Sequence, residues 1–320
     1  MGMFYRNFWL SKEAFFALVL VVLFVTPLFV FGGSRVIYVD KDASGSEDGT
    51  SSHPYKTISK ALKNADDGDE VRVKNGTYKE NITLPKEVSL YGHSEKRDKV
   101  IIESDNDDKP TVSMKHGTVL SHITVKGGRH GVRVLEGAKA HVFDVVVKNS
   151  DRDGIHIDSA SCDKKHRVLI DKTRIINNNR AGIFSEKRFI VILNSDVVGN
   201  GSDGIDLASG TKAWLEGNRL NDNKGSGAKL VLDGASLYGK KNGFRNNHRE
   251  GLEVSAYGAQ GTIELKRSAF VGNDRYGVAR VARTTGGTKM FGNLSFGQGV
   301  NESRFEGNTL GNLSSIVRGF

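Results

Sequence analysis

Hydrophobic residues alternate with polar ones in short stretches along most of this chain. Apolar pairs separated by one residue include Ile155 and Ile157, Val168 and Ile170, Val191 and Leu193, and Ile263 and Leu265. Alternation with a period of two predicts strands that bury one face. Clusters of Gly, Asn, Asp and Ser separate these stretches, and no segment beyond residue 65 has ten residues of helical apolar spacing. The pattern therefore predicts an all-β chain of short strands joined by tight turns.

A repeat of 22 to 28 residues organises these strands. Its marker is a glycine followed by an apolar and then a variable residue, at Gly131, Gly154, Gly182, Gly204, Gly227, Gly251 and Gly277. An asparagine stands four residues before most of these glycines, at Asn178, Asn200, Asn223, Asn247 and Asn273, and Asn149 is offset by one. A period of this length indicates one supersecondary unit stacked on copies of itself.

About three short strands per repeat, with no helical segment between them, predict a solenoid of parallel strands. We expect the repeated glycines and asparagines at sharp corners, because both tolerate left-handed backbone. Stacked asparagines are also expected to hydrogen-bond from coil to coil. A β-sandwich is the alternative, but sandwiches do not repeat a glycine–asparagine offset. Thr57 is expected to cap a short helix, residues 58–65, whose apolar face covers the open end of the core.

The repeat phrase N-x-x-x-G-[ILV]-x-[ILV] resembles that of right-handed parallel β-helix proteins of the pectin-lyase-like superfamily, including those that mature periplasmic copper sites or bind carbohydrate. The segment Val36 to Ser94 is similar to the opening segment of that superfamily. It contains a Tyr–Val strand, a Gly/Ser/Asp loop, a Pro-aromatic-x-Thr-Ile helix start, a GD-x-V strand, a G-T-Y turn and an E-N-I-T-L strand. The resemblance covers nearly the whole chain after residue 35. It implies a right-handed parallel β-helix and says little about activity.

The first 35 residues differ in composition from the rest. Residues 14–31 form an apolar run, broken only by one Thr–Pro pair and preceded by Arg6 and Lys12. This length favours an uncleaved membrane anchor, with the N-terminus in the cytoplasm and the remainder exported. Cleavage near Gly33, among small residues, would instead give a secreted protein. We expect residues 1–35 as a cytoplasmic tip and signal anchor, and 36–320 as the β-helix domain. Within that domain we expect an opening segment and cap at 36–100, regular coils at 101–282, and irregular last coils with a C-terminal cap at 283–320.

The chain of 320 residues has a formal net charge of +9 and one cysteine, Cys162. A single cysteine excludes an intramolecular disulfide, so the fold depends on its strand ladder and core. The positive charge favours anionic partners such as acidic polysaccharide, a teichoic-acid-like polymer or lipid headgroups. The alternative is an ordinary mixed surface with a modest excess of one sign. Short basic runs without interleaved aromatic residues argue against nucleic acid. The sequence does not predict an oligomeric state.

Aligning the repeat glycines places equivalent residues in columns about 4.8 Å apart. Because the columns alternate with core positions, we expect them to face solvent on one sheet. Candidate catalytic residues in these columns are Asp203, Asp206, Glu253, Asp153 and His156, and candidate ligand-binding residues are Phe184, Lys229, Arg133 and Tyr276. Asp206 and Glu253 would stand two coils apart, at about 9.6 Å, near the upper end of the carboxylate separation in inverting glycosidases.

The same columns have a structural interpretation, because any solenoid carries charge on its outer strand positions. The motif SDGIDL, Ser202 to Leu207, is similar to the first acidic motif of polygalacturonases. The paired-aspartate, Gly-His-Gly and Arg-Ile-Lys motifs of that family do not follow, and the signatures of pectin methylesterases and alginate epimerases are absent. A lyase would need clustered aspartates on calcium with an arginine base, a role for Asp203, Asp206 and Arg180. We predict no cofactor, with calcium as the exception for a lyase.

Two further patterns concern metal binding and glycosylation. The longest repeat contains soft and imidazole ligands for zinc or copper at His156, Asp158, Cys162, Asp163 and His166. Their spacing matches no known zinc finger, so an ordinary polar loop is favoured and no metal site is predicted. Six N-x-[S/T] sequons would carry glycans only in a host that adds them, at Asn75, Asn81, Asn200, Asn293, Asn301 and Asn312.

These observations favour an exported, membrane-anchored β-helix protein that binds or organises cell-envelope or extracellular carbohydrate without catalysis. The first alternative is a polysaccharide lyase or glycoside hydrolase that uses the acidic residues of one face. The second is a structural surface spacer.

Overall fold

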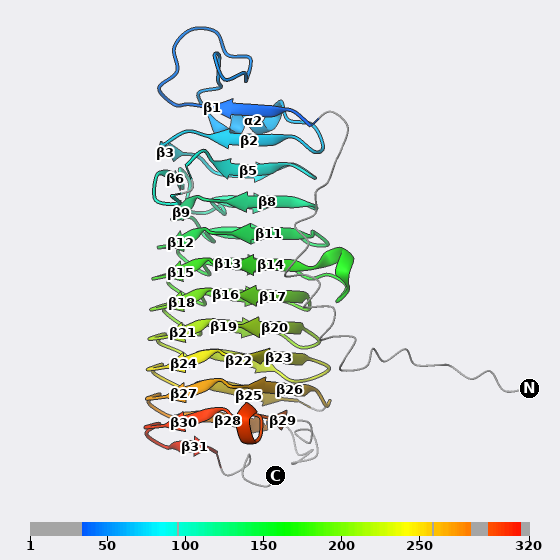
Figure 1. Cartoon of the computed structure of the whole chain (residues 1–320), viewed down its shortest axis with the longest axis vertical. Coiled ribbons are helices and arrows are strands. Elements are labelled where there is room, and N and C mark those ends of the chain that lie inside the picture. Colours follow the sequence, from blue (N-terminus) through cyan, green and yellow to red (C-terminus); the bar gives the residue numbers. More distant parts are fainter. Residues whose placement is uncertain (1–33, 95, 258, 283–293, 315–320) are drawn as a thin grey trace, which may run out of the picture. The chain divides into compact units, whose positions relative to one another are not determined.

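The computed structural model describes residues 34–94, 96–257, 259–282 and 294–314. Three parallel sheets, here named A, B and C, run along a solenoid (Figure 1). In the described residues they contain 11, 10 and 10 strands respectively. From β2 onward the chain visits A, B and C in turn, so each strand pairs with the strand three positions later in sequence. The prediction of an all-β parallel solenoid with about three strands per repeat is confirmed.

The bounds of the strands follow the repeat. Sheet A contains β1 (Val36–Val39), β2 (Glu70–Val73), β5 (Ser89–Gly92), β8 (Thr118–Ser121), β11 (Ala140–Phe143), β14 (Val168–Asp171), β17 (Phe189–Leu193), β20 (Lys212–Glu216), β23 (Ser236–Lys240), β26 (Thr262–Lys266) and β29 (Leu294–Ser295). Sheet B contains β3 (Gly76–Lys79), β6 (Val100–Glu103), β9 (Thr124–Lys126), β12 (Val146–Lys148), β15 (Arg174–Ile176), β18 (Asp196–Val198), β21 (Arg219–Asn221), β24 (Gly243–Arg245), β27 (Ala269–Val271) and β30 (Arg304–Glu306). Sheet C contains β4 (Ile82–Leu84), β7 (Val112–Met114), β10 (Val132–Val134), β13 (Ile155–Ile157), β16 (Ile183–Ser185), β19 (Ile205–Leu207), β22 (Ala228–Val231), β25 (Leu252–Ala256), β28 (Tyr276–Ala282) and β31 (Gly311–Leu313).

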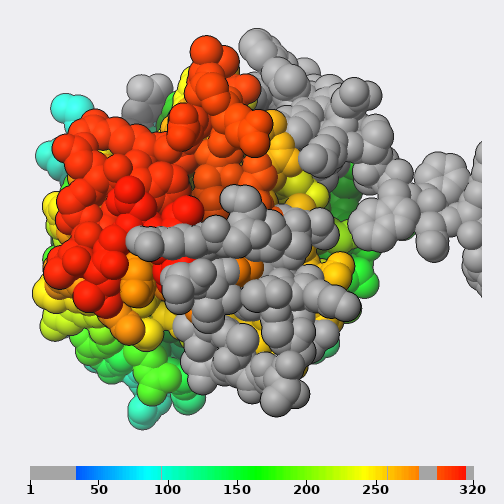
Figure 2. Space-filling view, turned by 90° about the horizontal axis from the view of Figure 1, so that it is seen from below, coloured from blue at the N-terminus to red at the C-terminus, as the bar shows by residue number. Residues whose placement is uncertain are grey.

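The core lies between the three sheets and is built from the inward half of each alternating strand. Viewed along the solenoid axis, coils coloured from cyan to red overlie one another (Figure 2). Phe244, Phe270 and Phe305 stack inside, with ring centroids 4.6 and 4.8 Å apart. In strand β17 the residues that face the core differ from the apolar pair that the sequence pattern indicated, Val191 and Leu193. In β17 the core residues are Ile190 and Ile192, because all five residues are apolar and alternation alone leaves the inward face ambiguous.

A ladder of buried asparagines runs along the corner between sheets B and C. Each side-chain Nδ2 donates to Oδ1 of the next asparagine at 2.7–3.1 Å, through Asn178, Asn200, Asn223, Asn247, Asn273 and Asn308. The same Oδ1 also accepts the backbone N–H of the preceding asparagine. The expected asparagine stacking is therefore confirmed, and it satisfies backbone groups that a buried corner would otherwise leave unpaired.

The left-handed backbone predicted for the repeated glycines and asparagines is wrong for all of them except Asn149, which has φ 58°. At this corner the left-handed residue is the one before each ladder asparagine, such as Asn177 at φ 55° and Asn246 at φ 52°. The repeated glycines instead lie too close to the next coil for a side chain. A Cβ on Gly182 would lie 2.3 Å from Val197, and one on Gly204 would lie 2.4 Å from the Gly227 carbonyl oxygen.

A second ladder, which the sequence pattern did not reveal, runs along the corner between sheets A and B. Its members are Thr173, Ser195, Asn218, Asn242, Ser268 and Ser303, each of the first five donating its backbone N–H to the side-chain oxygen of the next. Serine and asparagine share the acceptor role, so no single residue type repeats. Two polar ladders therefore fix the stacking register of the coils that position the outer residues.

The helix α2 (Ile58–Lys63) lies against β1, β2 and β4 at one end of the solenoid, where Thr57 accepts a hydrogen bond from the Lys60 N–H. It ends two residues before the expected Ala65. The predicted hydrophobic segment 14–31 lies outside the described residues, so the anchor and the division at residue 35 stay predictions. Within the described residues no helix has both the length and the hydropathy that crossing a bilayer requires.

The last described coil continues all three sheets through β29, β30 and β31. Asn308 continues the asparagine ladder after the left-handed Gly307. Within the region 283–320, the described residues 294–314 contain these three strands and a 3-10 turn, η3 (Gly299–Asn301). Residues 283–293 and 315–320 lie outside the described part.

Candidate functional site

The outer face of sheet C carries the predicted columns in the predicted register. Paired residues on successive strands β10, β13, β16, β19, β22 and β25 are Arg133, His156, Phe184, Asp206, Lys229 and Glu253. The column one residue before each glycine lies at the adjoining corner and contributes His130, Asp153, Asp203 and Glu250. Repeat alignment alone therefore located which side chains are neighbours.

The predicted solvent exposure of these columns is wrong for several members. Asp203 is 6% exposed, Glu253 is 1% exposed, and Asp153, His130 and Glu250 are also buried. Alternation says only that a side chain points away from the core. It does not say that long side chains from the next coil and the corner fold over it.

The centre of the face contains Asp203 and Asp206, both on or beside β19. Asp203 Oδ1 accepts the Ser226 N–H at 2.7 Å, while Asp206 Oδ2 lies 3.3 Å from Lys229 Nζ. Burial raises the pKa of Asp203 to about 6, against the opposing hydrogen bond from Ser226 and with help from the Asp206 charge. Burial also raises the pKa of Asp206, although Lys229 opposes the shift. Asp203 is therefore able to hold a proton close to neutral pH.

Around β25, two arginines neutralise the buried glutamates of the sheet C face. Glu253 lies 3.0 Å from Arg249 Nη2, and Glu250 lies 3.5 Å from Arg249 Nε and 3.2 Å from Arg275 Nε. Ser226 Oγ also donates to Glu250 at 3.2 Å. Glu253 is thus buried and paired, while Lys229 holds Asp206 on the coil between them. Both carboxylates of the pair considered for inverting hydrolysis, Asp206 and Glu253, are therefore engaged by basic side chains.

The opposite part of the face is an imidazole–carboxylate cluster. Asp153 Oδ2 lies 3.0 Å from His156 Nδ1 and 3.3 Å from His130 Nδ1, and His156 Nε2 lies 3.4 Å from Asp158. Arg133 closes the cluster by donating from Nε to both Asp158 oxygens at 3.1 Å. The His130 and His156 ring centroids are 4.3 Å apart.

The charges of this cluster follow from its contacts. Burial alone would lower the pKa of His156, but hydrogen bonds to Asp153 and Asp158 raise it to about 9. Burial would raise the pKa of Asp153, yet its interactions with both histidines hold it well below the usual range. Burial lowers the pKa of His130. At neutral pH the cluster therefore pairs a cationic His156 with an ionised Asp153, beside a neutral His130.

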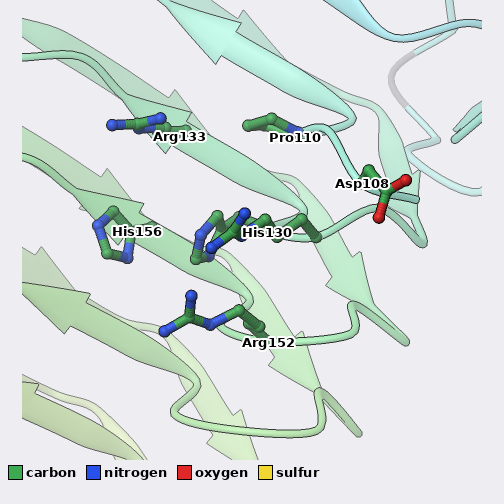
Figure 3. Close-up of a pocket in the computed structure, with 7 residues that line it drawn as sticks. Asp108, Pro110, His130, Arg133, Arg152 and His156 are labelled. Atoms are coloured by element: carbon green, nitrogen blue, oxygen red, sulfur yellow. The ribbon is translucent and has the colours of Figure 1, made fainter. Parts of the chain in front are cut away.

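A surface pocket of about 270 Å³ opens over this cluster, lined by Asp108, Pro110, Arg129, His130, Arg133, Arg152 and His156. Figure 3 shows the two imidazoles next to each other, with Arg133 on one side of them and Arg152 on the other. Three of the seven lining residues are arginines and one is a carboxylate. The pocket is therefore suited to an anion.

An arginine column, two residues before the repeat glycines, was missed by the sequence interpretation. Its members are Arg129, Arg152, Arg180, Arg249 and Arg275. Backbone hydrogen bonds connect them directly, since Arg152 N–H donates to the Arg129 carbonyl and Arg180 N–H to that of Arg152. Arg249 and Arg275 pair with the buried glutamates, whereas Arg129, Arg152 and Arg180 have no carboxylate within ion-pair distance among the described residues. The alignment of the repeat glycines contains this arginine column one position before the column that begins with His130.

The family described as "Right handed beta helix region" matches residues 111–270, half of the chain. The chain belongs to this family. Among solved structures this β-helix protein is similar to pectate lyase Pel9A, with a TM-score of 0.58 and 13% identity over 79% of this chain and 78% of that chain. It is similar to the A-module of mannuronan C-5 epimerase AlgE4 from Azotobacter vinelandii, at 0.54 and 13% over 87% and 97%. The alginate lyase of Paenibacillus sp. str. FPU-7 gives 0.52 and 13% over 87% and 99%. Identities this low show the fold alone, and no curated protein sequence matches the chain.

The aromatic candidates on the β-helix are separated. Phe184 is partly exposed and stacks on His156 with centroids 5.0 Å apart and ring planes inclined by 23°. Tyr276 is partly exposed at the start of β28, several coils away, and Tyr257 is exposed after β25. Only Phe184 adjoins the pocket residues, so it is the one aromatic candidate that shares a site with the arginines.

The five residues considered as metal ligands in the longest repeat lie in separate places in the structure. His156 and Asp158 belong to the sheet C cluster, whereas Asp163 and His166 pair with each other at 2.8 Å across the short turn η1 (Lys164–His166). Cys162 donates from Sγ to the Gly210 carbonyl at 3.2 Å. The five residues do not converge on one point.

The asparagine side chains of two sequons form hydrogen bonds within the fold. Asn200 is buried in the asparagine ladder, and Asn81 Nδ2 donates to Ser104, Asn106 and Pro110. Glycosylation at either nitrogen would break these bonds. Asn293 lies outside the described residues, while Asn75 and Asn312 are exposed and Asn301 is partly exposed.

Proposed function

We propose that this β-helix protein binds an acidic polysaccharide along the corner between sheets B and C, without cleaving it. The arginine column is the observation that carries this proposal. Arg129, Arg152 and Arg180 stand on successive coils with no carboxylate partner in the described part of the chain, and two of them line the pocket over His130 and His156. A row of unpaired guanidinium groups attracts a polymer that carries negative charges at intervals.

The spacing and the flanking groups support a sugar polymer rather than a single anion. Guanidinium groups on neighbouring coils are anchored about 4.8 Å apart along the solenoid axis. A guanidinium fork bonds a carboxylate through two parallel hydrogen bonds. The partly exposed ring of Phe184 lies beside the same row and offers an apolar surface for a sugar ring.

The names of the fold neighbours suggest which probes to use. Pectate, mannuronan and alginate, named for those proteins, are all polymers with carboxylate groups. Export and membrane anchoring through residues 14–31 would place the β-helix where such polymers occur, and this location is part of the proposal. The net charge of +9 has the required sign.

The test is equilibrium binding of the full-length chain to polygalacturonate and alginate, with neutral dextran as the comparison. The double variant Arg129→Gln/Arg180→Gln is expected to bind roughly 5- to 30-fold more weakly, because two exposed ion pairs contribute about 0.5–1 kcal/mol each. The matched control is Arg219→Gln/Arg245→Gln, which removes two exposed charges from sheet B. Equal weakening in both variants, or equal binding of dextran, would overturn the proposal and leave the spacer hypothesis.

Polysaccharide cleavage is the second candidate function, and Asp203 is the observation that favours it. A carboxyl with a pKa of about 6 is suited to general acid catalysis near neutral pH. Reducing-sugar and unsaturated-product assays on the same polymers test this candidate. Turnover that Asp203→Asn abolishes would establish cleavage, whereas saturable binding with no product would retain binding as the function.

A further inference from the structure

Three side chains on two neighbouring coils, His130, Asp153 and His156, point their ligand atoms at one another. Each residue offers one ligand atom, a ring nitrogen or a carboxylate oxygen, and these three atoms lie within 4.8 Å of one another. Both His130 and Asp153 are buried, with 5% and 6% of their surface exposed. The three residues therefore form a compact donor set below the arginine-lined pocket.

The distances match a shared metal ion. Zinc bonds imidazole nitrogen and carboxylate oxygen at about 2.0–2.1 Å, so adjacent ligands in a tetrahedral site are about 3.3 Å apart. Asp153 Oδ2 lies 3.3 Å from His130 Nδ1 and 3.0 Å from His156 Nδ1. The ligand atoms of the two histidines lie within 4.8 Å of each other, so a rotation of the imidazole rings would bring all three atoms around one ion.

One donor atom is unsatisfied. His130 Nδ1 is buried and has no hydrogen-bond partner among the residues that the structure describes, because its approach to Asp153 does not have hydrogen-bond geometry. Burying a polar nitrogen without a partner costs free energy, and most such groups in folded proteins are paired. Coordination to a metal ion would satisfy this nitrogen.

Residues around the donor set hold it in place. Asp158 lies 3.4 Å from the second ring nitrogen of His156, and Arg133 in turn clamps Asp158. A carboxylate behind a metal-bound histidine fixes the orientation of the ring and raises its basicity. Two features oppose ion binding. His156 Nδ1 is hydrogen-bonded to Asp153 and must release its proton to the solvent before it can coordinate a metal ion. The charge of Arg152 also lies close enough to act on His130.

We propose that His130, Asp153 and His156 bind one divalent transition-metal ion, with zinc as the expected occupant. Two imidazoles and one carboxylate leave the fourth tetrahedral position directed to the pocket, as in three-ligand zinc sites. An ion of charge +2 exceeds the single charge of Asp153, so the occupied site attracts anions. Metal binding does not depend on the proposed polysaccharide binding and is tested without any glycan.

The experiment uses the full-length chain without a histidine tag, stripped with a chelator and titrated with Zn²⁺ by calorimetry, and with Co²⁺ by visible absorption. We expect one Zn²⁺ per chain and a Co²⁺ spectrum with nitrogen ligands. His130→Ala and Asp153→Asn are each expected to weaken Zn²⁺ binding by more than the about 10- to 100-fold typical of losing an outer-shell partner. Asp153→Asn preserves side-chain volume, so it reports on ligation even if His130→Ala unfolds.

The matched control is His166→Ala, because His166 forms a similar pair with Asp163 away from the cluster. Its Zn²⁺ affinity should equal that of the wild type. Absence of stoichiometric Zn²⁺ binding by the wild type would overturn the proposal. So would equal losses in His166→Ala, or unchanged affinity in folded Asp153→Asn.

Discussion

Replacing Asp203 by Asn is expected to stabilise the fold at neutral pH and to leave it unchanged in acid. Asp203 is 6% exposed, and its pKa rises from 3.8 to about 6 on folding. A shift of about 2 pKa units corresponds to about 3 kcal/mol between the two protonation states. The folded chain therefore disfavours the ionised carboxylate by this amount.

The dependence on pH distinguishes this effect from a change in contacts. Below pH 3.8 the carboxyl is protonated in both the folded and the unfolded chain, and the free energy of unfolding has its full value. Between pH 3.8 and about 6 the unfolded chain ionises first, so the free energy of unfolding falls by about 3 kcal/mol and is then constant. Asparagine keeps the acceptor for the Ser226 N–H and does not ionise.

Urea unfolding of the wild type and Asp203→Asn between pH 3.5 and pH 8 measures the difference. We expect the variant to be about 2–3 kcal/mol more stable above pH 7, with a gap that closes towards pH 3.5. The control is Asp105→Asn, which changes an exposed carboxylate in the same way. A gap that is independent of pH, or a variant less stable at pH 8, would refute the reasoning about burial.

Three further outcomes follow from the coil contacts and the cluster. Asn223→Ala should lower the free energy of unfolding by about 2–4 kcal/mol in urea, because it leaves ladder groups on both neighbouring coils without partners. Gly204→Ala should cost about 1–3 kcal/mol in the same assay, since its Cβ would lie 2.4 Å from a carbonyl oxygen, whereas Gly243→Ala, with a nearest contact of 3.5 Å, should not. Arg152→Gln should tighten Zn²⁺ binding severalfold in calorimetry, because it removes a positive charge beside His130. Weaker binding in that variant would contradict the charge argument.

The architecture was predictable because the repeat imposes one constraint on every coil. Asparagines four residues before a glycine mark the ladder, and they also align the outer columns to the residue. The second ladder was not predictable, because Ser195, Asn218 and Ser268 supply the same acceptor from different residue types. A sequence repeat is visible only at positions where every coil requires the same residue type.

The candidate site was only half predictable. The column of Arg133, His156, Phe184 and Asp206 was placed correctly. The burial of Glu253 and Asp203 was not predicted, because burial on an outer face depends on how far neighbouring side chains reach. His130 was assigned no role from sequence, since a metal-binding motif on one strand is local whereas this cluster joins two coils 23 residues apart.

The pairing of charges separates the two halves of the sheet C face. In the half around β25 the corner arginines Arg249 and Arg275 are satisfied by buried Glu250 and Glu253, so these four groups hold the coils together. In the half around β13 the corresponding arginines have no carboxylate partners among the described residues, and the outer position on β16 is an aromatic ring. Charge left uncompensated on the folded surface is available to a ligand, whereas compensated charge is not. The half around β25 therefore has the structural role that charged columns have in any solenoid, and ligand binding is expected at the basic half around β10, β13 and β16.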